Sequence, residues 1–81
     1  MENIKLFVTS VCPFCVGCED YIQDNDLNVE IVDAAKSPEA QSELLEIGGM
    51  MQVPMLSIDG EALFESADIL QWLKDHTEEL K

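Results

Sequence analysis

The chain has 81 residues, of which 47% are apolar, so it can bury one small core, and we expect a single domain over residues 1–81. Seventeen acidic residues against four lysines give a formal net charge of −13, which makes nucleic acids and anionic membranes unexpected partners. The absence of a membrane-length apolar run and of signal-peptide features, together with an odd count of three cysteines, predicts a cytoplasmic protein rather than a disulfide-stapled secreted one.

The first half of the chain predicts two strands joined by a helix. Residues 4–9 are apolar and β-branched enough for a buried strand. Pro13 suits the first turn of a helix, and a helical pattern continues over 14–23 until turn-forming residues at 24–26 end it. Residues 28–33 alternate with period two, as a strand does. Because a helix joins these strands, we expect them to be parallel with a right-handed crossover.

The second half predicts a helix, a hairpin and a last helix. Ser37 and Pro38 mark the start of a helix that stops at Gly48 and Gly49. The elements expected after it are a strand over 54–58, a turn at Asp59–Gly60, a strand over 62–64 and a helix capped by Ser66. The complete order is β-α-β-α-β-β-α. It predicts an α/β fold, a four-stranded mixed sheet with helices on both faces.

The segment Cys12-Pro13-Phe14-Cys15 has the spacing of a thiol–disulfide exchange site. Two cysteines three residues apart at a strand-to-helix junction lie within bridging reach. Cys12 faces the positive end of the helix dipole, which stabilises a thiolate, whereas Cys15 lies one turn inside and can attack a mixed disulfide formed at Cys12. Pro13 stiffens the turn and Phe14 supplies an apolar rim. These features predict a small redox protein.

Three cysteines in one short segment could also serve a metal. Half of a zinc site is one alternative, but the remaining candidate ligands are only Cys18 and His76, and no metal site is expected. Cys18 shares a helix face with Cys15, where a small buried residue is expected. It could instead be a third redox sulfur that traps Cys15, or an iron–sulfur ligand in Cys-x-x-Cys-x-x-Cys. His76 is expected on the surface near a frayed C-terminus, without a catalytic role.

The chain resembles the glutaredoxin family of the thioredoxin fold over essentially its whole length. The cysteine pair follows the first strand, Val53–Pro54 opens the third, and Asp59–Gly60 forms the hairpin. The segment 65–70 is similar to the start of the last helix in glutaredoxins and in the N-terminal domains of glutathione transferases. The resemblance implies a thioredoxin-like fold and a dithiol thiol–disulfide oxidoreductase. It also implies glutathione as co-substrate and no bound cofactor.

The resemblance assigns roles at matching positions. Cys12 would be the nucleophile and Cys15 the resolving thiol, with a cis Pro54 facing Cys12 and keeping metals off it. The Val53 backbone would pair with an extended substrate, and the Asp68 carboxylate would hold the ammonium of the γ-glutamyl end of glutathione. The substrate-contacting and glutathione-contacting set is Thr9, Pro13, Phe14, Val53, Pro54, Ser66, Ala67 and Asp68. Plain helix capping is the alternative role for Ser66 and Asp68.

Three departures from the family pattern bear on the electron donor. Phe14 stands where dithiol glutaredoxins usually have tyrosine, and Thr9 and Glu46 stand where they often have basic residues. No lysine or arginine occurs from residue 37 to residue 73, and Lys36 is the one cation that could fold toward the site. Such cations usually receive the glycyl carboxylate of glutathione. An alternative is therefore a glutaredoxin-like redoxin that thioredoxin reductase reduces and that donates electrons to an enzyme such as ribonucleotide reductase.

Two further hypotheses concern partners. An iron–sulfur carrier bridging two chains through Cys12 and glutathione is disfavoured by Pro13, because cluster-binding members tend to have glycine there. The acidic residues are spread from Glu2 to Glu79, which indicates a solvated surface; the alternative is steering toward a basic protein partner or exclusion of anionic small thiols. The expected partners are disulfide-containing proteins, with glutathione or thioredoxin reductase as electron donor, and the protein is expected to be a monomer.

Overall fold

The computed structural model describes residues 3–10 and 12–81 as an α/β fold. The elements are β1 (Ile4–Val8), α1 (Pro13–Asp24), β2 (Glu30–Asp33), α2 (Pro38–Gly48), β3 (Met55–Ile58), β4 (Glu61–Leu63), α3 (Ser66–Asp75) and α4 (Thr77–Leu80). This order confirms the expected β-α-β-α-β-β-α succession and adds α4 at its end. No helix in the described part of the chain is long and apolar enough to cross a membrane.

The four strands form one mixed sheet in the order β2-β1-β3-β4. In β1, Leu6 lies opposite Ile31 of the parallel β2 and opposite Leu56 of the antiparallel β3. Asp59 and Gly60, with φ of 51° and 93°, form the turn between β3 and β4, which agrees with the hairpin expected from the Asp-Gly pair. The predicted parallel pair β1–β2 and the antiparallel hairpin β3–β4 are therefore confirmed.

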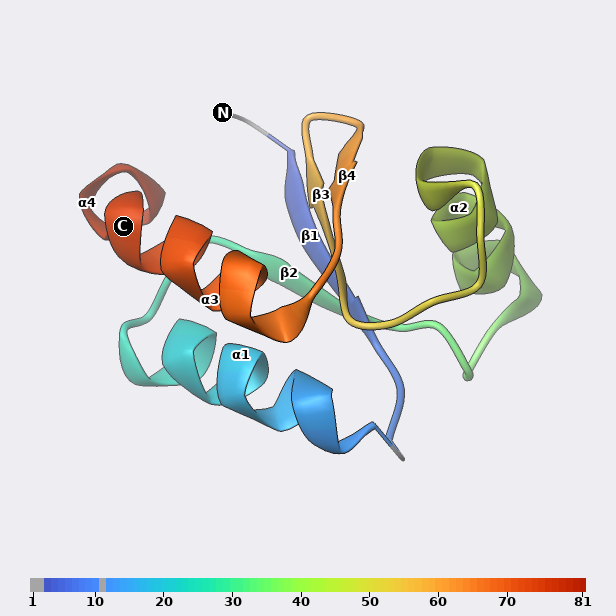
Figure 1. The fold of residues 1–81 in the computed structure, drawn as a ribbon, viewed down its shortest axis with the longest axis horizontal. Coiled ribbons are helices and arrows are strands. Elements are labelled where there is room, and N and C mark those ends of the chain that lie inside the picture. The colour runs from blue at the N-terminus through green and yellow to red at the C-terminus, as the bar shows by residue number, and fades with distance from the viewer. Residues whose placement is uncertain (1–2, 11) are drawn as a thin grey trace.

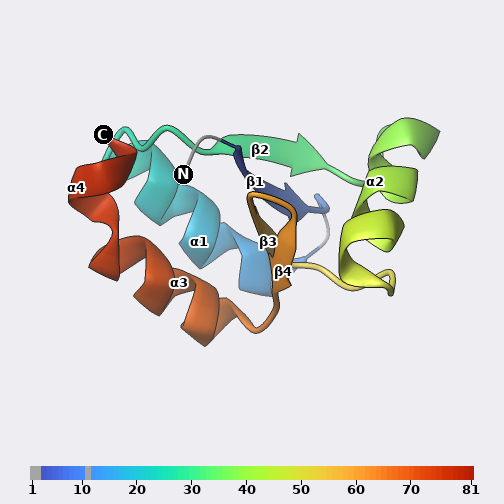
Figure 2. The ribbon, with the colours of Figure 1, turned by 90° about the horizontal axis from the view of Figure 1, so that it is seen from above.

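Helices cover both faces of the sheet, with α1 and α3 on one side and α2 on the other (Figures 1 and 2). Successive side chains of β1 point to opposite faces of the sheet, so β1 contributes to the cores on both sides. Leu6 and Val8 enter the larger core under α1 and α3, whereas Phe7 enters a smaller core with Leu44 and Met55 under α2. Both faces of β1 are thus anchored, and the chain leaving Val8 reaches α1 from a firmly packed strand.

Two of the expected helix termini agree with the structure and one does not. Ser37 accepts a hydrogen bond from the Ala40 amide at 3.0 Å, and α2 ends at Gly49 with φ of 75°. The prediction that Ser66 caps α3 is wrong, because Glu65 occupies the N-cap position with φ of 72° and Ser66 is the first helical residue. The chain enters α3 through this left-handed residue, which sets the helix start one position earlier.

The expected frayed C-terminus is also wrong. Helix α4 is tied down by Leu80, which is buried and whose carbonyl accepts from the Asn28 amide at 2.6 Å. The Tyr21 hydroxyl and the Thr77 hydroxyl are 2.7 Å apart. His76 is half-buried and stacks on Trp72 with 4.1 Å between ring centroids. The contacts with Asn28 and Tyr21, which are distant in sequence, hold α4 in place. With four residues, α4 is too short to give a helical hydrophobic pattern in the sequence.

Candidate functional site

The first cysteine of the pair stands at the N-cap of α1. Its φ of −95° and ψ of 105° are extended, and its carbonyl accepts the first helical bond from the Cys15 amide at 3.2 Å. Its own amide donates to the Thr9 carbonyl at 3.3 Å, and Pro13 follows it in the first turn. The Cys12 thiol is half-buried and lies 3.9 Å from the Val53 carbonyl oxygen. Cys12 is therefore held beside the segment before β3, as predicted.

Cys15 lies one turn inside the helix and is fully buried. Burial raises the pKa of its thiol to about 12, and a hydrogen bond with Cys12 acts in the same direction. A backbone hydrogen bond to Thr9 opposes these effects without outweighing them. At neutral pH Cys15 is consequently protonated, and Cys12 is the thiol of this pair that is open to a substrate.

Cys18 is buried in the larger core, in agreement with the expectation that it fills space there. Its thiol donates to the Ser66 carbonyl at 3.6 Å, which joins α1 to the first residue of α3. Burial raises the pKa of this thiol also. All three cysteines are free thiols. Cys18 thus links α1, the helix that carries Cys12 and Cys15, to the first residue of α3.

The peptide bond between Val53 and Pro54 is cis, as the resemblance to glutaredoxins implies. Pro54 is buried immediately before β3, and the Val53 carbonyl faces the Cys12 thiol. The segment that turns into β3 thereby lies against the N-terminal end of α1, although the two are about forty residues apart in sequence.

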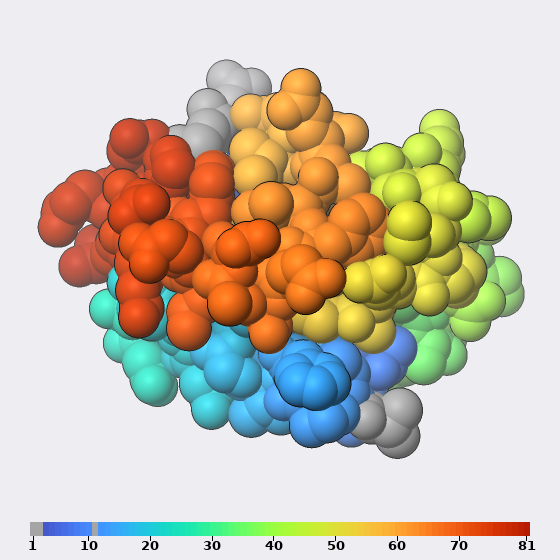
Figure 3. Space-filling model, in the orientation of Figure 1, coloured from blue at the N-terminus to red at the C-terminus, as the bar shows by residue number. Residues whose placement is uncertain are grey.

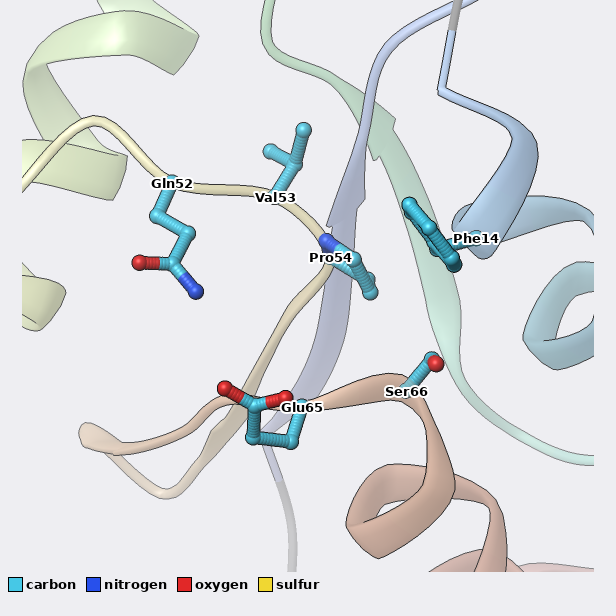
Figure 4. A pocket seen from close by; sticks show the side chains of 6 residues that line it. All are labelled: Phe14, Gln52, Val53, Pro54, Glu65 and Ser66. Carbon is cyan, nitrogen blue, oxygen red and sulfur yellow. The ribbon is translucent and has the colours of Figure 1, made fainter.

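A cleft of about 360 Å³ opens beside this junction, lined by Phe14, Gln52, Val53, Pro54, Glu65 and Ser66 (Figure 4). Figure 3 shows the start of α1, the segment before β3 and the start of α3 meeting on one face. Phe14 is 69% exposed and forms the predicted apolar rim. Of the residues expected to contact substrate, the cleft therefore gathers Phe14, Val53, Pro54 and Ser66.

The other expected contact residues lie around this cleft rather than in its wall. Pro13 is exposed in the first turn of α1, and Ala67 and Asp68 are exposed in the first turn of α3. Thr9 lines a second cavity of about 180 Å³ together with Ala34, Ala35, Gln41, Leu44, Met51 and Val53. Val53 is the residue common to both linings.

Sequence reasoning did not assign two of the lining residues, Gln52 and Glu65. Figure 4 shows their side chains pointing toward one another on the same side of Pro54. The available signals were position alone: Gln52 precedes Val53–Pro54, and Glu65 precedes the last helix. Neither residue type has a characteristic spacing, so only the folded arrangement brings them together.

The cleft contains a carboxylate and no cation. Among the described residues that line either cavity there is no lysine. Lys5 is paired with Glu43 at 2.8 Å, and Lys36, the cation considered from the sequence, is exposed. Within residues 3–10 and 12–81, no three His, Cys, Asp or Glu side chains gather as metal ligands would. The cleft therefore carries a negative charge, and its lining residue Val53 has its carbonyl beside the Cys12 thiol.

Comparison with known proteins gives a family and a fold. A family model for glutaredoxin matches residues 4–63, whereas no curated protein sequence matches the chain. The crystal structure of the thioredoxin-like protein BC3987 is 28% identical, has a TM-score of 0.74, and covers 88% of this chain and 99% of its own.

Two plant glutaredoxins share the fold at lower identity. The wheat protein is 24% identical with a TM-score of 0.64, covering 90% of this chain and 71% of its own. The buckwheat protein, solved as a glutaredoxin–glutathione complex, is 15% identical with a TM-score of 0.67, covering 93% and 71%. With a family match that spans most of the chain and includes both Cys12 and Cys15, the protein belongs to the glutaredoxin family of thiol–disulfide oxidoreductases.

Proposed function

We propose that the protein is a dithiol glutaredoxin in which Cys12 attacks and Cys15 resolves, reducing protein disulfides and glutathione mixed disulfides. The observation that carries this proposal is the division between the two thiols. Cys12 is half-buried at the start of α1, and Cys15 is fully buried with a pKa of about 12. An accessible Cys12 sulfur can attack a substrate disulfide, and a buried, protonated Cys15 thiol can then resolve the mixed disulfide.

The exchange transfers two electrons from the dithiol to the substrate disulfide. The Cys12 thiolate attacks one substrate sulfur, the substrate S–S bond breaks, and the first substrate thiol leaves after taking a proton. Cys15 then gives its proton to solvent and attacks the Cys12 sulfur. The second substrate thiol leaves, and a Cys12–Cys15 disulfide remains to be reduced by the electron donor. Desolvation of Cys15 keeps it from competing in the first step.

Glutathione is the first candidate donor. The buckwheat relative was solved as a glutathione complex, and Ser66, Ala67 and Asp68 stand at the start of α3, where backbone amides and the Asp68 carboxylate suit a γ-glutamyl group. The Val53 backbone beside Cys12 suits an extended peptide. We further propose that residues 1–81 act as one cytoplasmic, monomeric domain without a bound cofactor.

Thioredoxin reductase is the second candidate donor, and the charge of the cleft favours it. Glu65 lines the cleft, and no lysine is among the described residues lining either cavity. A glycyl carboxylate of glutathione would thus meet no cation there. In this alternative the protein passes its electrons to a reductase such as ribonucleotide reductase.

A donor-specific assay tests both forms of the proposal. Reduction of an insulin disulfide is followed with glutathione and glutathione reductase, and separately with thioredoxin reductase alone, each by NADPH consumption. Cys12→Ser is expected to abolish turnover in whichever system works. Cys15→Ser is expected to retain reduction of a glutathione mixed disulfide and to lose reduction of the protein disulfide. If neither system reduces the wild-type protein, both donors are excluded.

A further inference from the structure

The second cavity, of about 180 Å³, shares Val53 with the cleft but opens on the other face of the sheet. Two of its lining residues, Ala34 and Leu44, are buried members of the smaller core under α2. Cys12 packs against the larger core under α1 and α3, and Val53 packs against both cores. The cavity and the reactive thiol therefore lie on opposite sides of the segment that leads into β3.

Contacts with Cys12 nevertheless place the cavity close to the reactive sulfur. Thr9, which lines the cavity, accepts a hydrogen bond through its carbonyl from the Cys12 amide at 3.3 Å. The carbonyl oxygen of Val53, which also lines it, is 3.9 Å from the Cys12 sulfur. A group bound in the cavity would thus lie beside a disulfide that Cys12 attacks.

The lining of the cavity is mainly apolar. Among the described residues that form it, five are alanine, leucine, methionine or valine, and the other two, Thr9 and Gln41, are neutral. The larger cleft, by contrast, includes Glu65. Apolar cavities of about 150 Å³ accommodate a molecule the size of benzene. The second cavity therefore has the size and the lining to accommodate an apolar side chain.

Two backbone amides at the cavity are already used within the protein. The Ala34 amide donates to the Val8 carbonyl at 2.8 Å. The Ala35 amide donates to the Asp33 carboxylate at 2.9 Å, which also places a negative charge next to the lining. A carboxylate entering the cavity would be repelled by this charge and would not find these amides free. The surroundings thus favour an apolar occupant over an anionic one.

Met51 forms an exposed part of the cavity wall. Its side chain is 56% exposed, and an apolar partner that covered it would remove this surface from water. Methionine is flexible and polarizable, so it adapts to apolar partners of different shape. The neighbouring Met50 is exposed to a similar extent, 49%, but is not among the lining residues. The two methionines therefore provide a matched pair for an experiment.

Resting on the disulfide exchange proposed above, with an extended substrate beside Val53, we infer that the second cavity is a specificity subsite. It takes an apolar side chain of a protein substrate, from the residue directly before or after the cysteine that Cys12 attacks. Successive side chains of an extended chain point to opposite sides. When the substrate sulfur faces Cys12, on the side of the larger core, the adjacent side chain points to the side of the smaller core, where the cavity lies.

Stoichiometric reduction of peptide disulfides by the pre-reduced protein tests this inference without any electron donor. The peptides have blocked termini, form symmetric disulfides, and carry leucine, glutamine or glycine directly before or after the cysteine. Each rate constant is divided by that for dithiothreitol to remove intrinsic reactivity. Leucine in one of the two positions is expected to raise this corrected rate about fivefold or more over glutamine or glycine. Equal corrected rates for all the peptides would overturn the subsite.

Met51→Glu and Met50→Glu locate the preference. Both variants add one negative charge at neighbouring exposed positions, so they change the overall charge equally. Met51→Glu is expected to reduce the leucine-to-glutamine ratio to about one, because a carboxylate in the wall disfavours an apolar occupant. Met50→Glu is expected to keep the wild-type ratio. Ala35→Leu, at another exposed lining position, is expected to reduce the ratio as well, because its side chain would take up part of the cavity.

The outcomes are distinguishable from failure of the proposed function. Wild-type protein that reduces none of the peptides overturns thiol–disulfide exchange itself. A leucine preference that Met50→Glu and Met51→Glu lower equally would place the contact outside the cavity and overturn the subsite. Sedimentation at the assay concentration tests a second copy of the chain as the occupant. A wild-type dimer that Met51→Glu dissociates and Met50→Glu does not would overturn the assignment of the cavity to a substrate.

Discussion

At the scale of single residues, Cys12 and Cys15 show how burial distinguishes two identical side chains. Cys12 and Cys15 are three residues apart and chemically identical, yet one is half-buried and the other has no exposed surface. The pair and its division were predictable from a strand-to-helix junction, because position along the first helical turn determines exposure. The conformation of Glu65 was not predictable, since its positive φ of 72° appears only in the folded chain.

The raised pKa of Cys15 predicts a pH dependence of stability in the reduced protein. The thiol has a reference pKa of 9.0 and a folded value of about 12, so between these values the folded state binds more protons than the unfolded state. Its stabilising contribution is complete below about pH 9 and is lost as pH rises toward about 12, with a slope of up to about 1.4 kcal/mol per pH unit. Urea unfolding of reduced protein at several pH values measures it.

Cys15→Ala is the control for this prediction, because it removes the titrating thiol and leaves the lysines and Tyr21 in place. Its unfolding free energy is expected to fall less steeply over the same interval. Equal slopes for the two proteins would mean that Cys15 ionises normally in the folded state.

Cys18→Ala tests whether the third thiol contributes to turnover. Cys18 packs in the core and donates to the Ser66 carbonyl at 3.6 Å, so truncation should cost about 1 kcal/mol of unfolding free energy. Because the proposed exchange uses only Cys12 and Cys15, the rate of disulfide reduction should stay within about twofold of wild type. A large loss of rate with stability intact would instead favour the third-redox-sulfur alternative.

At the scale of elements, two helix glycines have opposite surroundings. A Cβ atom on Gly48, the last residue of α2, would lie 2.7 Å from the Met55 sulfur and 2.9 Å from the Phe64 ring. A Cβ atom on Gly17, within α1, would meet nothing within 4 Å. The close approach at Gly48 is what lets α2 lie against β3 and the residue after β4.

Alanine at these two positions is expected to have opposite effects. Gly17→Ala should stabilise the protein by about 0.5–1 kcal/mol because alanine favours helix. Gly48→Ala should destabilise it by about 1 kcal/mol or more, since overpacking outweighs the same propensity gain. Urea denaturation of the two variants provides the comparison, and stabilisation by Gly48→Ala would show that Met55 and Phe64 can move aside.

Elements were predictable where local rules decide them and not where tertiary contacts do. The start of α2 followed from Ser37 and Pro38, and the hairpin from Asp59–Gly60. Helix α4 has only four residues and depends on contacts with Tyr21 and Asn28, so its sequence gives no periodic signal. The start of α3 was displaced from expectation because Glu65, rather than Ser66, takes the N-cap position.

At the scale of the whole molecule, the most pronounced feature is the net charge of −13. Lys5–Glu43 is the ion pair recorded within the described residues, and the full chain has 17 acidic residues against four lysines, so acidic groups outnumber cations and repel one another. The mixed sheet, the layers and the position of Cys12 and Cys15 at the start of the first helix followed from sequence, because hydrophobic alternation and the strand-to-helix junction constrain them, whereas the strand order β2-β1-β3-β4 was not assigned from it. The distribution of charge around the cleft did not, since it depends on which exposed side chains meet.

This charge predicts stabilisation by salt near neutral pH. Screening self-repulsion at a net charge of −13 should raise the thermal midpoint by several degrees, or about 1 kcal/mol, between low salt and physiological ionic strength. Thermal unfolding followed by circular dichroism measures the shift. At about pH 4, where many carboxylates are protonated, the shift should become smaller. An equal shift at both values would point to a cause other than carboxylate repulsion.

The two cavities share a wall at Val53, which lines both of them. Its neighbour Gln52 lines the larger cleft but not the second cavity, and Figure 4 shows the two side chains on opposite sides of the backbone. A substitution at position 52 would therefore change the polarity of the cleft without altering the lining of its neighbour, whereas a substitution at position 53 would alter both. For protein engineering, position 52 adjusts one compartment by itself, and position 53 adjusts the two together.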